Sequence, residues 1–288
     1  MAIVDTHITE HRLELGDHDM FYLAAGPEDG PLIVFVHGWP ELGYSWRHQL
    51  PVLGGLGFRA IAPDLRGHGR SSVYPRYEDY SMEKHVGDLI QMITLLGREK
   101  AVWVGHDWGA CVAWSLASHH PEHTYAVANL CIPYATLEAG LEQVVGLVDR
   151  RIYPEADYPA GQWDYQYFYE ESFERATTVF DANPETTIKA LFRASFDPDG
   201  RNTPAITATI RRDGGWFGGL DAAPDTPLDE EVISEEELQV YVNALTRTGF
   251  FGTDAFYMNH AANKEYFKTR KNDGCLEMPA LFLAASQD

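Results

Sequence analysis

The chain has 288 residues, of which 45% are hydrophobic, so it is long and apolar enough to fold around a core, and a disordered chain is excluded. Its formal net charge at pH 7 is −21, and no run of basic residues interrupts this acidic surplus. The charge argues against nucleic acid and anionic membrane surfaces as partners, and it favours a small neutral ligand.

The first half of the chain alternates strand-like and helix-like segments. His11–Leu15 and Met20–Ala25, separated by the turn sequence GDHD, predict a hairpin. The apolar run Leu32–Val36 predicts a strand that is buried on both faces. The next predicted segments are a helix over Trp46–Leu53, a strand over Arg59–Ala62, a helix over Met82–Leu96, a strand over Ala101–Val104, a helix over Ala110–Ser118 and a strand over Tyr125–Leu130. This alternation predicts a doubly wound, mostly parallel α/β sheet that binds its ligand beyond the carboxyl ends of the strands.

The pattern changes after Pro133, because about the next 140 residues contain helical and aromatic stretches but no convincing buried strand. Asn183-Pro184-Glu185 predicts one helix start, and the capping box Ser234 to Glu237 predicts another helix, which Gly249 can end. Strand character returns at Pro279–Ala285. We therefore expect a core in two parts, residues 1–133 and 272–288, with an inserted helical cap over residues 134–271.

Residues 105–110 read GHDWGA and directly follow the apolar run Ala101–Val104. A nucleophile flanked in this way by small residues is typical of a sharp strand–turn–helix elbow, from which its side chain projects at the carboxyl edge of the sheet. Here that side chain is the carboxylate of Asp107, where serine is more common. A carboxylate can attack a saturated carbon to form an alkyl ester, which water must then break. Asp107 is therefore the candidate nucleophile.

The sequence HGWP, residues 37–40, follows the third predicted strand. In hydrolases with this elbow, such a loop supplies one backbone N–H of an oxyanion hole, and the residue after the nucleophile supplies the other. The predicted donors are Trp39 and Trp108. Each is expected to contribute on the order of 3 kcal/mol when water attacks the ester.

Together with DLRGHGRS at residues 64–71, HGWP and GHDWGA at this spacing resemble the soluble epoxide hydrolases of the α/β-hydrolase superfamily. Haloalkane and fluoroacetate dehalogenases share much of this core. The resemblance covers essentially the whole chain. It implies an enzyme that hydrolyses a small apolar epoxide with water to a vicinal diol, through an ester on Asp107.

The resemblance also implies two tyrosines that bind and protonate the epoxide oxygen. The cap segment WDYQYF places the first at Tyr165, with Tyr167 as the most plausible misassignment, and GFFG followed by Phe256-Tyr257 places the second at Tyr257. Neutral phenols suit this role because an O–H can bind the oxygen and donate its proton as the alkoxide forms. Trp163, Phe168 and Phe192 suggest an apolar substrate pocket, although such aromatic residues are also ordinary core.

The strand before Asp288 resembles the place where the family keeps the acid that orients its catalytic histidine. That histidine should follow roughly 25 residues later, beyond the end of this chain. His37, His106 and His260 do not occupy its position. We expect a carboxyl-terminally truncated copy that is impaired in ester hydrolysis and exposes the edge of its last strand.

Other patterns point to neither cofactor nor metal. Gly55-Leu56-Gly57 mimics a dinucleotide motif but would follow a helix and precede a strand, the reverse of the required order. His119, His120 and His123 are interrupted by Pro121 and fit a solvated helix end better than a zinc site. The widely spaced Cys111, Cys131 and Cys275 predict reduced thiols.

The first residues, MAIVDTHITEH, contain no basic region followed by an apolar core, and no apolar stretch reaches the roughly 18 residues of a membrane span. We expect a cytoplasmic protein, with a peroxisomal address left open because the natural carboxyl terminus is expected to lie further on. Two other functions stay open. One is a dehalogenase with the same nucleophile, and the other is a scaffold that binds a small hydrophobic molecule without turnover.

Overall fold

The computed structural model describes residues 7–194 and 203–285 of the chain. These residues form a seven-stranded sheet of order β1-β2-β4-β3-β5-β6-β7. The strands are β1 (Thr9–Leu15), β2 (His18–Ala25), β3 (Leu32–Val36), β4 (Arg59–Pro63), β5 (Ala101–His106), β6 (Thr124–Leu130) and β7 (Ala280–Leu283). β1, β2 and β4 pair antiparallel, and every pair from β4 through β3, β5 and β6 to β7 is parallel. The predicted hairpin and the mostly parallel sheet are confirmed.

Alternate residues of the central strands are buried on opposite faces of the sheet. All five residues of β3 are buried. Val34 and Val36 belong to a core that includes residues of helices α2 (Met82–Leu95) and α3 (Trp108–His119), whereas Ile33 and Phe35 belong to a core that includes Leu50 of α1 (Gln49–Gly55). A strand buried on both faces has no polar alternation, which explains the fully apolar run.

The helix predicted over Trp46–Leu53 begins later than expected. Residues Gly43–Trp46 form a 3₁₀ turn instead, and α1 starts at Gln49. Pro51 gives the reason, because it has no N–H for an intrahelical hydrogen bond and is tolerated only in the first turn of a helix.

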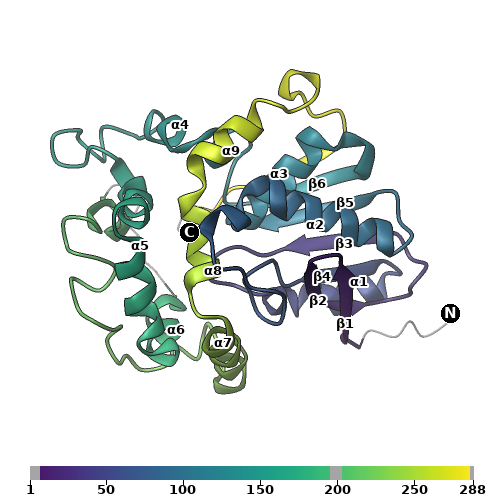
Figure 1. The fold of residues 1–288 in the computed structure, drawn as a ribbon, viewed down its shortest axis with the longest axis horizontal. Coiled ribbons are helices and arrows are strands. Elements are labelled where there is room, and N and C mark those ends of the chain that lie inside the picture. Colours follow the sequence, from purple (N-terminus) through teal and green to yellow (C-terminus); the bar gives the residue numbers. More distant parts are fainter. Residues whose placement is uncertain (1–6, 195–202, 286–288) are drawn as a thin grey trace.

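Between β6 and β7 the described residues form helices and turns but no strand. The helices are α4 (Leu141–Val145), α5 (Asp164–Asp181), α6 (Pro184–Leu191), α7 (Glu235–Thr248), α8 (Phe251–Asp254) and α9 (His260–Phe267). Asn183 caps α6, and the predicted capping box opens α7, which ends at Gly249 with φ 66°. In Figure 1, α4 to α7 lie to the side of the sheet, and α8 and α9 lie between them and the strands.

The predicted strand over Pro279–Ala285 is present only as Ala280–Leu283, at the edge of the sheet next to β6. All four of its side chains are exposed, including those of Leu281, Phe282 and Leu283. Asp288, the predicted acid, lies outside the described residues.

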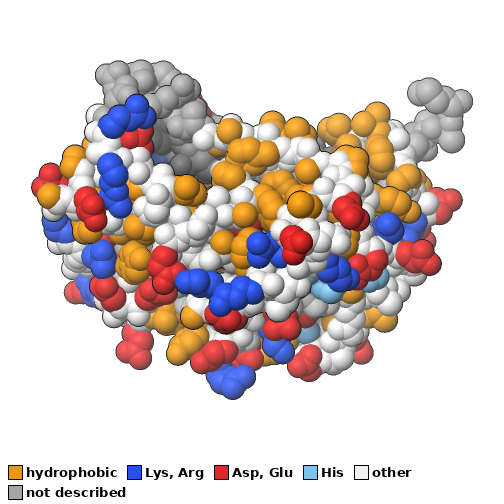
Figure 2. Space-filling model, turned by 90° about the horizontal axis from the view of Figure 1, so that it is seen from above, with side chains coloured by type: hydrophobic (Ala, Val, Ile, Leu, Met, Phe, Trp, Pro, Cys, Tyr) orange, Lys and Arg blue, Asp and Glu red, His pale blue; other side chains and the backbone are white. Residues whose placement is uncertain are grey.

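No helix in the described part of the chain is long and apolar enough to cross a membrane. On the face shown in Figure 2, lysine and arginine side chains are scattered among acidic ones and form no continuous basic surface.

Candidate active site

Asp107 lies at the turn between β5 and α3, and its backbone is in a conformation that residues with a side chain rarely adopt, φ 51° and ψ −129°. The glycines on either side of it make the turn possible. A Cβ atom on Gly105 would lie 2.3 Å from the Gly109 carbonyl oxygen, and one on Gly109 would lie 2.2 Å from the Val36 carbonyl oxygen. The elbow predicted from GHDWGA is therefore present, with Asp107 at its apex.

We expect Gly109→Ala to lower the free energy of unfolding by about 1–3 kcal/mol, because the added methyl group would meet backbone atoms that cannot move independently. Gly87→Ala is the matched control, since Gly87 is exposed on α2 and a Cβ there has no neighbour within 4 Å. That change should raise stability by roughly 0.5–1 kcal/mol, as alanine favours a helix. Urea denaturation measures both, and equal stability of the two variants would contradict this account of the elbow.

The two predicted oxyanion donors face the Asp107 carboxylate. The Trp39 backbone N–H donates to Asp107 Oδ1 at 2.7 Å, and the Trp108 backbone N–H also hydrogen-bonds this carboxylate. A Cβ on Gly38 would lie 2.3 Å from Asp107 Oδ1, so only glycine lets the loop approach this closely. The same two N–H groups can stabilise a negative oxygen that forms on the carboxyl carbon of Asp107.

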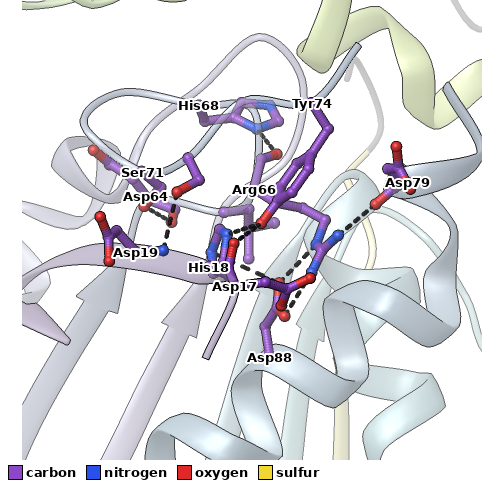
Figure 3. A network of polar contacts seen from close by, with 12 residues as sticks. Asp17, His18, Asp19, Asp64, Arg66, His68, Ser71, Tyr74, Asp79 and Asp88 are labelled. Atoms are coloured by element: carbon purple, nitrogen blue, oxygen red, sulfur yellow. Dashed lines mark hydrogen bonds and ion pairs between the residues drawn. The ribbon is translucent and has the colours of Figure 1, made fainter. Parts of the chain in front are cut away.

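The segment DLRGHGRS contacts the HGWP loop at His37, and Figure 3 shows part of the polar network of this segment. Asp64 Oδ1 accepts a hydrogen bond from the Gly43 N–H at 2.9 Å, and the Leu65 N–H donates to His37 Nε2 at 3.0 Å. Arg66 forms two hydrogen bonds of 2.7 Å to the buried carboxylate of Asp88 on α2. The segment DLRGHGRS therefore connects the HGWP loop to α2 through hydrogen bonds.

Asp107 is buried, and desolvation raises its pKa from 3.8 to about 6. The charge of His106 and the hydrogen bonds from Trp39 and Trp108 act in the opposite direction, while the charge of Glu41 raises the pKa further. At neutral pH Asp107 therefore remains mostly ionised in an apolar site, as a carboxylate nucleophile must be.

The two predicted tyrosines lie together next to the nucleophile. The ring centroids of Tyr165 and Tyr257 are 5.7 Å apart, and the Tyr257 ring lies 5.4 Å from that of Trp108. Burial and the charge of Asp107 both raise the pKa of Tyr257 well above its usual value, so its hydroxyl stays protonated. Tyr167 instead lies beneath the guanidinium of Arg211. The geometry therefore favours Tyr165 over Tyr167 as the partner of Tyr257.

Three further residues of the site were missed from the sequence. Tyr169 stacks on Tyr257 at 4.1 Å, Trp216 stacks on Trp39 at 5.6 Å, and Asp254 accepts a hydrogen bond from the Trp39 indole. Trp216 stands in GGWFGG, where four glycines with positive φ flank two aromatic residues, and this pattern could have drawn attention to it.

Two of the three residues predicted to line the substrate pocket, Phe168 and Trp163, lie in different surroundings. Phe168 is buried, its ring lies 6.3 Å from that of Tyr169, and it lines a small pocket together with Phe180 and Trp216. Trp163 is half-buried and packs partly against a separate cluster that contains Val148, Tyr153 and Ala208. A role for either residue in substrate binding stays a prediction.

The histidines near the site already have structural surroundings. Both ring nitrogens of His37 have backbone partners, one of them the Leu65 N–H, and His106 lies 3.0 Å from the Glu41 carboxylate. His260 is buried, and desolvation lowers its pKa to about 4. That none of them acts as the catalytic base stays a prediction.

Comparison with known proteins places this geometry in a family. A family model described as alpha/beta hydrolase fold matches residues 31–191. Epoxide hydrolase A of Mycobacterium tuberculosis is 31% identical over 283 residues, which cover 97% of this chain and 82% of the relative. Bifunctional epoxide hydrolase 2 of Sus scrofa is 31% identical over 90% of this chain, which spans only 43% of the pig protein.

Solved structures give the same result. The crystal structure of epoxide hydrolase A from Mycobacterium thermoresistibile superimposes with a TM-score of 0.76 and 32% identity, over 96% of this chain and 82% of that one. Potato (Solanum tuberosum) epoxide hydrolase I superimposes with a TM-score of 0.70 and 29% identity, over 96% of this chain and 81% of that one.

Proposed function

Because the chain belongs to the epoxide hydrolases of the α/β-hydrolase fold, we propose that it hydrolyses a small apolar epoxide to a vicinal diol without a cofactor. One observation carries the proposal. A buried carboxylate at the elbow, Asp107, lies beside the paired rings of Tyr165 and Tyr257. A carboxylate opposed by protonated phenols suits an electrophile whose leaving group is a strained ether oxygen.

In the first step an oxygen of Asp107 attacks one epoxide carbon, and the bond from that carbon to the ring oxygen breaks. The ring oxygen takes the electron pair and receives a proton from Tyr165 or Tyr257, which gives a hydroxyalkyl ester of Asp107. In the second step water attacks the ester carbonyl, and the N–H groups of Trp39 and Trp108 hold the resulting oxyanion. Collapse breaks the bond to the diol oxygen, which takes one proton of the attacking water. The other proton of that water returns to the tyrosinate, so the diol leaves and both the carboxylate and the phenol are restored.

Family resemblance supports the remaining assignments. Asp288 would orient the catalytic histidine that the family resemblance implies, and that histidine would activate the water. The core would comprise residues 1–133 and 272–288, with a cap over residues 134–271. The location we propose is cytoplasmic, and the partners are an epoxide and water.

Isotope labelling tests the ester mechanism. In a single turnover with enzyme in excess in ¹⁸O-labelled water, the label should enter the carboxyl group of Asp107, because water attacks the acyl carbon. The first diol formed should then carry only unlabelled oxygen. Label in the first diol would mean that water attacks the epoxide directly, which would refute the role of Asp107.

A dehalogenase is the first alternative, since it can use the same nucleophile. It needs N–H donors for the halide, and the Trp39 indole N–H already donates to Asp254 at 2.7 Å. This contact weighs against the alternative. Halide release from a haloalkane, compared with diol formation from the matching epoxide, distinguishes the two. A scaffold that only binds a hydrophobic molecule would give neither product nor adduct.

The raised pKa of Asp107 predicts how alkylation depends on pH. The ionised form attacks, so the rate of adduct formation should rise with pH and level off above about pH 7, with a midpoint near the pKa of about 6. At pH 5 the rate should be about a tenth of the plateau, because only that fraction of the carboxyl group is ionised. Stopped-reaction mass spectrometry measures it, and a rate independent of pH between 5 and 8 would contradict the prediction.

A further inference from the structure

Asp254 is a buried carboxyl group, fully shielded from solvent, that lies at the end of α8 and three residues before Tyr257. Its Oδ1 accepts a hydrogen bond of 2.7 Å from the indole Nε1 of Trp39. The backbone N–H of the same tryptophan donates to Asp107 at 2.7 Å. Trp39 therefore connects the nucleophile, through its backbone, with the segment that carries Tyr257, through its side chain.

The indole of Trp39 packs against three other aromatic rings of the site. Its ring lies 6.1 Å from that of Tyr257, 6.4 Å from that of Tyr169 and 5.6 Å from that of Trp216. A rotation of this indole would change its contacts with these rings and would disturb the adjoining backbone N–H, which donates to Asp107. A group that fixes the orientation of the indole therefore also helps to fix the positions of Asp107 and Tyr257.

The buried surroundings of Asp254 favour a hydrogen-bond acceptor over a second negative charge beside Asp107. Burial raises its pKa well above the usual value, which favours the neutral carboxyl group over the charged one. The titratable groups that interact electrostatically with Asp254 are Asp181, Tyr169 and Tyr257. A neutral acid can accept the indole N–H without repelling the carboxylate of Asp107.

We propose that Asp254 is a positioning residue that, through its hydrogen bond to the Trp39 indole, locks the oxyanion loop onto the segment carrying Tyr257. The bond sets the distance between nucleophile and phenol, which must be correct in the first step. This role rests on the proposed function. The chemistry of the bond requires only an acceptor at residue 254 and a donor at residue 39.

Four variants separate this role from general stability. Asp254→Asn keeps an oxygen acceptor of the same size, Asp254→Leu removes it, and Trp39→Phe removes the donor. The double variant Trp39→Phe with Asp254→Leu leaves neither group unpaired. Circular dichroism and the denaturation midpoint first establish that each variant is folded.

The readout is the single-turnover rate of Asp107 alkylation at saturating epoxide, with the half-saturating concentration determined separately. We expect Asp254→Asn to stay within about twofold of the parent and Asp254→Leu to lose on the order of tenfold or more in rate, because small misplacements of reacting groups are costly. The half-saturating concentration should change less. The double variant should recover part of the loss seen in Asp254→Leu.

A second measurement does not depend on activity. The Trp39 indole N–H, assigned in the nitrogen-15 spectrum by its loss in Trp39→Phe, should exchange slowly with solvent in the parent and in Asp254→Asn. It should exchange quickly, or shift, in Asp254→Leu. Parental alkylation and unchanged indole exchange in folded Asp254→Leu would overturn the proposal, as would an equal rate loss in Asp254→Asn. If the parent forms no adduct with any epoxide, the proposed function fails, and indole exchange alone decides whether the bond exists.

Discussion

Asp107→Ala should abolish the covalent adduct that the parent chain forms with a reactive epoxide, and should reduce diol formation by several orders of magnitude. The reason is structural. The Asp107 carboxylate stands at the apex of the elbow, in reach of the Trp39 N–H at 2.7 Å and buried from water. Alanine leaves no nucleophile there. Intact-protein mass spectrometry after incubation with styrene oxide should show a mass increase of one epoxide in the parent and none in the variant.

Asp29→Ala is the matched control, because it removes the same charge from an exposed position in the turn before β3. It should be alkylated at the parental rate. Peptide mapping should place the adduct on the peptide that contains Asp107. An adduct of unchanged yield in Asp107→Ala would show that another residue reacts, and the assignment of the nucleophile would be wrong.

Those parts of the fold that depend on local pattern could be predicted from the sequence. The apolar run of β3 can be buried only between two layers of helices, and the small residues around Asp107 are needed because added Cβ atoms would meet backbone. The capping box that opens α7 is equally local, since its two hydrogen bonds join residues three apart.

Features that depend on contacts between distant residues could not be predicted in this way. The hydrogen bond from Trp39 to Asp254 joins residues 215 positions apart, and the stacking of Tyr169 on Tyr257 depends on how α5 meets the turn after α8. Neither residue stands out in its own segment, because buried tyrosines and acidic residues at helix ends are common. The late start of α1 depends instead on local sequence, because Pro51 fits only in the first turn of a helix.

The paired phenols should matter in the first chemical step more than in binding. Tyr257 is fully buried with a raised pKa, and the Tyr165 hydroxyl accepts a hydrogen bond from Gln166 Nε2 at 3.0 Å, a bond that does not use its own proton. Each O–H interacts most strongly with the oxygen as it becomes an alkoxide. Tyr165→Phe and Tyr257→Phe should therefore each slow alkylation of Asp107 by about tenfold with a small change in the half-saturating epoxide concentration.

Loss of both phenols should slow alkylation on the order of a thousandfold or more, because the departing oxygen then has no acid to protonate it. Tyr167→Phe is the control, since that ring lies beneath Arg211 while Tyr165 contacts Tyr257. Rapid-quench mass spectrometry of the four variants measures the rates. If Tyr167→Phe proved damaging and Tyr165→Phe did not, the first phenol would be Tyr167. Because the rings of Tyr165 and Tyr257 lie only 5.7 Å apart, a rate loss in the double variant smaller than the product of the single losses would mean that the two hydroxyls share one proton transfer.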